Sequence, residues 1–264
     1  MHPIVNIAIR AARSAGDIIM RATGRMDKLT VTHKAQHDYV SEVDQMAEQE
    51  IIRTIRKAYP EHAILAEESG RSATESEFEW IIDPLDGTTN FLHQFPQYSV
   101  SIAVRHKGRL EHAVVYDPLK DEIFSASRGA GAQLNGHRLR VSSARGLDGA
   151  LLGTGFPFKD QRYLDLYLQM FKAMIIPTAG IRRAGSAALD LAYVAAGRLD
   201  GFWELNLNPW DMAAGLLLIQ EAGGMVSDIK GGHNIFETGH VIAANPKVFK
   251  AMVKALHPYA SQID

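Results

Sequence analysis

The chain of 264 residues contains no cysteine. Disulfide bonds, thiolate metal sites, iron–sulfur clusters and a cysteine nucleophile are therefore excluded. The chain also has no large excess of charge, because 28 basic and 30 acidic residues give a formal net charge of -2. Direct binding of nucleic acid through bulk charge is not expected. Hydrophobic residues make up 46% of the chain, which is enough to bury a full core.

Long apolar runs are absent as well. No stretch approaches the roughly 20 apolar residues of a membrane-spanning helix. The N-terminal stretch MHPIVNIAIRAARSAG has no basic n-region, and Arg10 and Arg13 come too early for a signal peptide. We therefore expect a cytoplasmic protein that makes no contact with a membrane.

The spacing of apolar residues divides the chain into two parts. Helical periodicity predicts helices over 3–22 and 42–59, and strict alternation from Tyr98 to Arg105 begins an antiparallel meander that extends to about residue 142. After about residue 145, strands alternate with helices, which favours a layered α/β arrangement. We expect an N-terminal α+β subdomain over 1–145 and a C-terminal α/β subdomain over 146–264, fused in one globule.

Acidic residues follow several of the predicted strands. In EWIIDPLDGTTN (79–90), a buried strand ends at Asp83 and Asp86 comes three residues later, while Glu67–Glu68 ends an earlier apolar run. Carboxylates that gather in one place repel each other unless cations neutralise them, and Mg²⁺ prefers such oxygen ligands. The amides of Gly87 and Thr88 would form a nest for phosphate. The pattern indicates a metal-dependent phosphoesterase.

Each of these carboxylates also has a simpler interpretation. Asp83 and Asp86 could form a turn after a strand, and Glu67–Glu68 could be a solvated strand end. Asp211 lies in the first turn of a predicted helix, where the helix dipole favours an acid, and Asp44 could serve only as the partner of an N-cap. The metal-site hypothesis depends on these residues coming together in space.

Two long motifs make the chain resemble the inositol monophosphatase family. They are WIIDPLDGTTNF (80–91) and WDMAAGLLLIQEAGG (210–224), and the match runs in order over nearly the whole chain. The segments 153–158 and 179–198 look most like the bacterial SuhB-type branch. The resemblance implies a layered α/β/α/β/α sandwich related to sugar bisphosphatases, a homodimer, and inhibition by lithium.

The resemblance also implies roles for individual residues. Two to three Mg²⁺ ions would be held by Glu67, Asp83, the Leu85 carbonyl, Asp86 and Asp211. Thr88 would orient the attacking water, with Asp44 behind it and Glu67 as a further catalytic group. Contacts to the substrate would come from Leu85, Asp86, Gly87, Thr88, Arg182, Gly185, Ala187, Glu204 and Asp211. The reaction implied is the hydrolysis of myo-inositol 1-phosphate to inositol and phosphate.

Other functions stay open at this point. Related enzymes hydrolyse sugar or nucleotide bisphosphates, so the small phosphate monoester could differ. Members of the SuhB-type branch are associated with transcription antitermination and ribosomal RNA maturation, which would require a protein partner from the transcription machinery. Arg182–Arg183 and the cluster of Arg138, Arg140 and Arg145 would offer basic surface for that contact.

Overall fold

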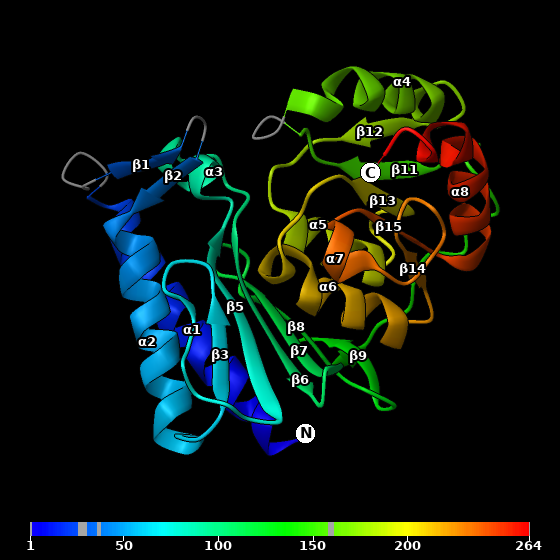
Figure 1. Cartoon of the computed structure of the whole chain (residues 1–264). Coiled ribbons are helices and arrows are strands. Elements are labelled where there is room, and N and C mark those ends of the chain that lie inside the picture. Colours follow the sequence, from blue (N-terminus) through cyan, green and yellow to red (C-terminus); the bar gives the residue numbers. More distant parts are fainter. Residues whose placement is uncertain (1, 26–30, 36–37, 158–160, 264) are drawn as a thin grey trace.

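Five layers of secondary structure build the molecule in the computed structural model, which describes residues 2–25, 31–35, 38–157 and 161–263 (Figure 1). A helix pair covers one face of an eight-stranded sheet, and a second pair lies between this sheet and a five-stranded sheet. A third pair covers the outer face of the smaller sheet. The expected α/β/α/β/α sandwich is therefore confirmed.

The first layer consists of α1 (Pro3–Thr23) and α2 (Glu42–Ala58). Proline suits the first turn of α1, where the missing N–H group has no partner to lose, and Ser41 with Asp44 forms the predicted capping box of α2. Both helices bury an apolar stripe against the large sheet. A small hairpin of β1 (Val31–Ala35) and β2 (Asp38–Ser41) leads directly into α2.

The eight-stranded sheet carries most of the first half of the chain. Its strand order is β10-β9-β8-β7-β6-β5-β3-β4, and all neighbouring strands are antiparallel except the parallel pair β3 and β5. The strands span β3 (Ala63–Ala66), β4 (Gly70–Arg71), β5 (Phe78–Asp86), β6 (Ser99–His106), β7 (Arg109–Asp117), β8 (Glu122–Ser127), β9 (Gly131–Leu134) and β10 (His137–Arg138). A short helix, α3 (Thr88–Leu92), follows β5.

The predicted meander ends earlier than its apolar pattern suggests. Pairing stops at Arg138, although the sequence predicts strand as far as residue 142. The amide of Leu139 still bonds to the carbonyl of Ala132, but that of Val141 bonds to the carbonyl of Ala222. The chain leaves the large sheet here because it crosses over to the second half of the fold.

The middle layer consists of α5 (Ala187–Ala195) and α6 (Pro209–Glu221), which lie between the two sheets in Figure 1. Both helices are apolar around most of their circumference, as expected for helices with packing partners on two sides. They approach each other closely at Gly215, where an added Cβ would lie 2.4 Å from the Cβ of Leu191. Glycine at this position allows the two helices to fit between the sheets.

The five-stranded sheet has the order β12-β11-β13-β15-β14, with two parallel pairs around β11 and two antiparallel pairs around β15. Its strands span β11 (Leu151–Thr154), β12 (Gly180–Arg182), β13 (Gly201–Glu204), β14 (Met225–Ser227) and β15 (Val241–Ala244). Besides α5 and α6, this half of the chain contains α4 (Leu164–Ile175), α7 (Ile235–Thr238) and α8 (Pro246–Ala260). In the described residues, no helix is both long and apolar enough to cross a membrane.

Candidate active site

An irregularity in β5 forms one wall of the candidate site. Asp83 pairs with Ser101 and Asp86 with Ser99, so three steps along β5 face two steps along β6. Pro84 follows Asp83 and has no N–H group to donate to the neighbouring strand, while the amide of Leu85 donates a hydrogen bond to the Asp83 carboxylate at 3.0 Å. Such a bulge redirects the side chains around it. Both aspartates line the same cavity as a result.

The next residue, Gly87, connects the bulge to α3. Its φ of +99° lies in the left-handed region, and an added Cβ would come within 2.9 Å of the Gln97 carbonyl oxygen. Only glycine fits this position without strain. The hydroxyl of Thr88 lies 2.9 Å from the Asp44 carboxylate and 3.1 Å from the Leu85 carbonyl.

Asp44 lies behind Thr88 and does not line the cavity itself. Its other carboxylate oxygen accepts hydrogen bonds from the amide and the hydroxyl of Ser41, at 2.9 and 2.5 Å. Burial raises the pKa of Asp44, although the hydrogen bonds from Ser41 and Thr88 oppose that shift. Asp44 is therefore both the partner of a helix cap and a buried proton acceptor in contact with Thr88.

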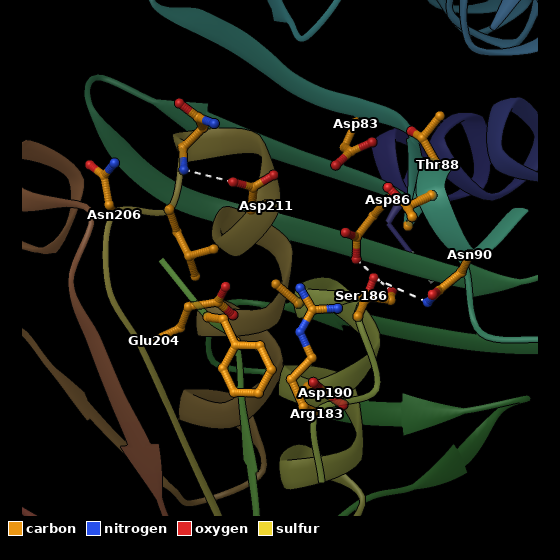
Figure 2. A pocket seen from close by; sticks show the side chains of 18 of the residues that line it. Asp83, Asp86, Thr88, Asn90, Arg183, Ser186, Asp190, Glu204, Asn206 and Asp211 are labelled. Carbon is orange, nitrogen blue, oxygen red and sulfur yellow. Dashed lines mark hydrogen bonds between the residues drawn. The ribbon is translucent and has the colours of Figure 1, made fainter. Parts of the chain in front are cut away.

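The cavity has a volume of about 160 Å³ and lies where β5, β13, α5 and α6 meet (Figure 2). It brings together carboxylates that are far apart in the sequence. Most of the residues that the sequence predicts for the site line it: Glu67, Asp83, Leu85, Asp86, Gly87, Thr88, Gly185, Ala187, Glu204 and Asp211. Asp211 also caps α6, because its carboxylate accepts the amide hydrogen of Asn208 at 2.7 Å.

Arg182 is not among the lining residues. It is exposed at the end of β12, where its guanidinium contacts the Ile181 carbonyl at 3.3 Å. The next residue, Arg183, lines the cavity instead, and Figure 2 shows its guanidinium directed toward Glu204 and Asp86. Arg183 also lies over the ring of Phe156, 5.3 Å from its centroid.

Burial raises the pKa of three carboxyls that line the cavity, and the charges of neighbouring carboxylates add to this effect at Asp83 and Glu204. Burial raises the pKa of Asp83 well above its usual value, and the negative charges of Glu67, Asp86 and Asp211 raise it further. Burial also raises the pKa of Asp86 to about 6, against the hydrogen bonds from α5. The pKa of Glu204 is raised well above its usual value by burial and then by the charge of Asp211.

The chemical types of the donors in the cavity suit a hard divalent cation. Within the described ranges, no three Asp, Glu or His side chains are arranged to hold a metal ion. Even so, the cavity offers carboxylate oxygens and the Leu85 carbonyl, which are the ligands that Mg²⁺ prefers. Burial, and for Asp83 also the charges of Glu67, Asp86 and Asp211, raises the pKa of these carboxyls, and a bound cation would favour their charged forms.

The sequence did not predict several residues that support the site. The Ser186 hydroxyl and the Ala188 amide donate to Asp86 at 2.6 and 2.8 Å and connect α5 to the end of β5. The Asn90 amide donates to the carbonyls of Gln97 and Ala184 at 2.7 and 2.8 Å. Asn90 lies inside the motif 80–91, whereas Ser186 and Ala188 lie in the segment 179–198, and their residue types gave no further signal.

Glu204, at the end of β13, depends on a second glycine. An added Cβ at Gly155 would occupy the space of the Glu204 carboxylate. Asp190 of α5 lies nearby, and burial followed by the charge of Asp86 raises its pKa well above its usual value. Glycine at position 155 therefore gives the Glu204 carboxylate room beside the cavity.

The layered α/β/α/β/α sandwich, with an acidic cavity beside the Gly87–Thr88 turn, places the chain in the class of proteins with a phosphatase-type fold. The chain belongs to the inositol monophosphatase family, whose model matches residues 1–261.

Known proteins resemble the chain over nearly its whole length. The protein called Nus factor SuhB of Pseudomonas aeruginosa is 58% identical to it over 264 residues, and the alignment covers 98% of this chain and 97% of that protein. Among solved structures, extragenic suppressor protein suhB of Bartonella henselae is 44% identical with a TM-score of 0.94, covering 97% of this chain and 98% of the other. Inositol monophosphatase of Anabaena is 38% identical with a TM-score of 0.86, covering 97% and 95%.

Proposed function

We propose that this protein hydrolyses a small phosphate monoester in a Mg²⁺-dependent reaction and that its substrate is myo-inositol 1-phosphate. The observation that carries the proposal is the acidic cavity directly beside the hydrogen-bonded pair of Thr88 and Asp44. Membership of the inositol monophosphatase family supports phosphatase activity. The products would be inositol and inorganic phosphate.

Two to three Mg²⁺ ions would be held by the side chains of Glu67, Asp83, Asp86 and Asp211 and by the Leu85 carbonyl. When bound, they would neutralise these carboxylates and stabilise the negative charge that develops on the phosphate oxygens. The chemistry of the donors supports this assignment, and so does the raised pKa of Asp83, which comes from burial and then from the charges of neighbouring carboxylates.

Thr88 and Asp44 would prepare the attacking water. The Thr88 hydroxyl donates to Asp44, so its oxygen lone pairs can accept a hydrogen bond from water and fix its orientation. Because burial raises the pKa of Asp44, this carboxylate is a better proton acceptor than an exposed aspartate. The water oxygen would form a bond to phosphorus as the ester bond breaks, and the water proton would pass through the Thr88 hydroxyl to Asp44. The leaving alkoxide would take up a proton and depart as the alcohol. The amides of Gly87 and Thr88 would bind the phosphate.

The other side of the cavity would recognise the alcohol. Glu204 can accept hydrogen bonds from the hydroxyls of a polyol, and the small residues Gly185 and Ala187 leave room for its ring. Arg183 takes the place that the sequence assigned to Arg182, because only the former lines the cavity.

The test is phosphate release by the purified protein from myo-inositol 1-phosphate, fructose 1,6-bisphosphate and adenosine 3′,5′-bisphosphate. We expect release from the inositol ester to exceed the others, to stop with EDTA and to fall with Li⁺. Asp83→Asn should abolish release and still fold, whereas exposed Asp148→Asn should behave like the parent. Equal turnover by Asp83→Asn and the parent would refute the metal assignment, and preference for a bisphosphate would refute the substrate.

A second role in transcription is supported by the name Nus factor SuhB of the relative at 58% identity. We propose that the chain also binds a protein of the transcription machinery in the cytoplasm, through the exposed side chains of Arg138, Arg140 and Arg145. An antitermination assay with bacterial RNA polymerase tests this. Asp83→Asn should keep the effect, and a triple alanine variant of the arginines should lose it. No effect of the parent protein would reject the role.

The same proposal includes a homodimer. Exposed apolar side chains on and after α4, namely those of Leu164, Leu168, Ile175 and Ile176, support an interface on this face of the molecule. Sedimentation of the purified protein should give twice the mass of 29.1 kDa, and Leu168→Asp should reduce it to the mass of one chain.

A further inference from the structure

Helix α2 carries a second buried carboxylate, Glu48, one turn after Asp44. Only 3% of the surface of Glu48 is exposed. One carboxylate oxygen accepts a hydrogen bond from the amide of Glu68 at 2.8 Å, and the other accepts one from the amide of Ser69 at 2.9 Å. A charged side chain thus connects α2 to the backbone of a segment about 20 residues away in the sequence.

That segment is the turn that carries Glu67. It joins β3 to β4, and its left-handed residue is Gly70, with a φ of +72°. The amide of Glu67 itself bonds to the carbonyl of Ile82 at 3.1 Å, one residue before Asp83. The turn is therefore held by β5 on one side of Glu67 and by Glu48 on the other.

The two carboxylates of α2 support the candidate site at two different points. Asp44 contacts Thr88, and Glu48 contacts the backbone that follows Glu67. Residues four apart lie on one face of a helix, so a single rigid element sets the spacing between these two parts of the site. Burial of a carboxylate costs free energy unless it is well hydrogen-bonded, and hydrogen bonds from backbone amides to a charged group are stronger than those to a neutral one.

We propose that Glu48 is a positioning residue for the metal site. By holding the amides of Glu68 and Ser69, it fixes the backbone that places Glu67 near Asp83, so that this part of the site rearranges less when the cation binds. This inference rests on the proposed function, and it concerns a residue that touches neither substrate nor metal.

Glu48→Gln tests the inference, because glutamine keeps the volume and one acceptor oxygen but turns an NH₂ group toward a backbone N–H. Loss of an outer contact of this kind typically weakens metal binding roughly tenfold or more. We expect the Mg²⁺ concentration for half-maximal phosphate release to rise by about that factor, with kcat at saturating Mg²⁺ changed by less than about threefold. The Mg²⁺-dependent rise in melting temperature, measured without substrate, should shift to the same higher concentration.

Glu50→Gln is the matched control on the same helix, because Glu50 bonds to Arg53 at the surface. It should leave both Mg²⁺ midpoints unchanged. If Glu48→Gln does not fold, Glu48→Asp takes its place in the test. Aspartate keeps the charge on a shorter side chain, so both Mg²⁺ midpoints should shift in the same direction by a smaller factor. Identical midpoints for Glu48→Gln and the parent, or an equal shift for Glu50→Gln, would overturn the inference alone. A parent protein that responds to Mg²⁺ in neither measurement would overturn the proposed function as well.

Discussion

Replacement of Asp86 by asparagine should make the metal-free protein more stable at neutral pH and weaken its stabilisation by Mg²⁺. Burial raises the pKa of Asp86 from 3.8 to about 6, against hydrogen bonds from Ser186 and Ala188. Below pH 3.8 the carboxyl is protonated in both the folded and the unfolded chain. As the pH rises from about 4 to 6, the unfolded chain loses this proton first, so the free energy of unfolding falls.

The size of the effect follows from the pKa difference. About two pKa units correspond to roughly 3 kcal/mol of stability that is present below pH 3.8 and lost once the pH has passed 6. Asparagine carries no charge, but one of the two hydrogen bonds from Ser186 and Ala188 is lost with it, at about 1 kcal/mol. The variant should therefore be more stable than the parent by about 1–2 kcal/mol at pH 7.5 and less stable by about 1 kcal/mol at pH 3.5.

Urea unfolding in EDTA at both pH values measures the difference, and repetition at pH 7.5 with Mg²⁺ gives the metal response. The parent should gain stability with Mg²⁺, whereas Asp86→Asn should gain little, because one carboxylate ligand is missing. The reasoning fails if the difference between variant and parent is the same at pH 3.5 and 7.5. It also fails if Asp86→Asn is the less stable protein at pH 7.5 in EDTA.

Two further predictions concern positions outside the metal ligands. Gly155→Ala would displace the Glu204 carboxylate, so KM for myo-inositol 1-phosphate should rise roughly tenfold or more, with the Mg²⁺ midpoint unchanged. Gly146→Ala is the control, because an added Cβ there meets no other atom. An unchanged KM for Gly155→Ala would contradict the role of Glu204. His112 stacks on His2, and burial and then the charge of His2 lower its pKa to about 4. The unfolded chain takes up this proton near pH 6.5 and the folded chain only near 4, a difference that corresponds to roughly 3 kcal/mol at most. Because solvent screens part of the ring, we expect the parent to lose about 1–2 kcal/mol of stability as the pH falls from 6.5 to 4, and His112→Asn to lose less. Parallel urea profiles for the two proteins would refute this.

Much of the fold could be predicted from local signals. Helical periodicity predicts α1 and α2 within one residue of their observed bounds, and apolar alternation predicts β6 within one residue. The end of the meander could not be predicted, because RLRVS (138–142) is as apolar in pattern as a strand. Whether it pairs depends on the path of the chain toward α6, where the amide of Val141 finds the carbonyl of Ala222.

Sequence reasoning also identified the acidic residues of the candidate site but left their meaning open. Asp44 and Asp211 each had a capping interpretation, and the structure shows that capping and placement at the site coincide. A capping carboxylate needs only one oxygen for the helix end, and Asp44 contacts Thr88 through its other oxygen. Helix capping and a place at the candidate site therefore do not exclude each other.

The sequence by itself determined the family, the helix starts and the strand-end carboxylates, because motifs, capping and periodicity are properties of neighbouring residues. Only the tertiary structure decided that Arg183 and not Arg182 lines the cavity, since side chains of successive residues on an extended chain point to opposite sides. It also decided that Ser186 and Ala188 hold Asp86, and that Glu48 holds the turn after Glu67. These contacts join segments 20 to 102 residues apart, and their geometry is set by how helices and sheets pack rather than by any local pattern.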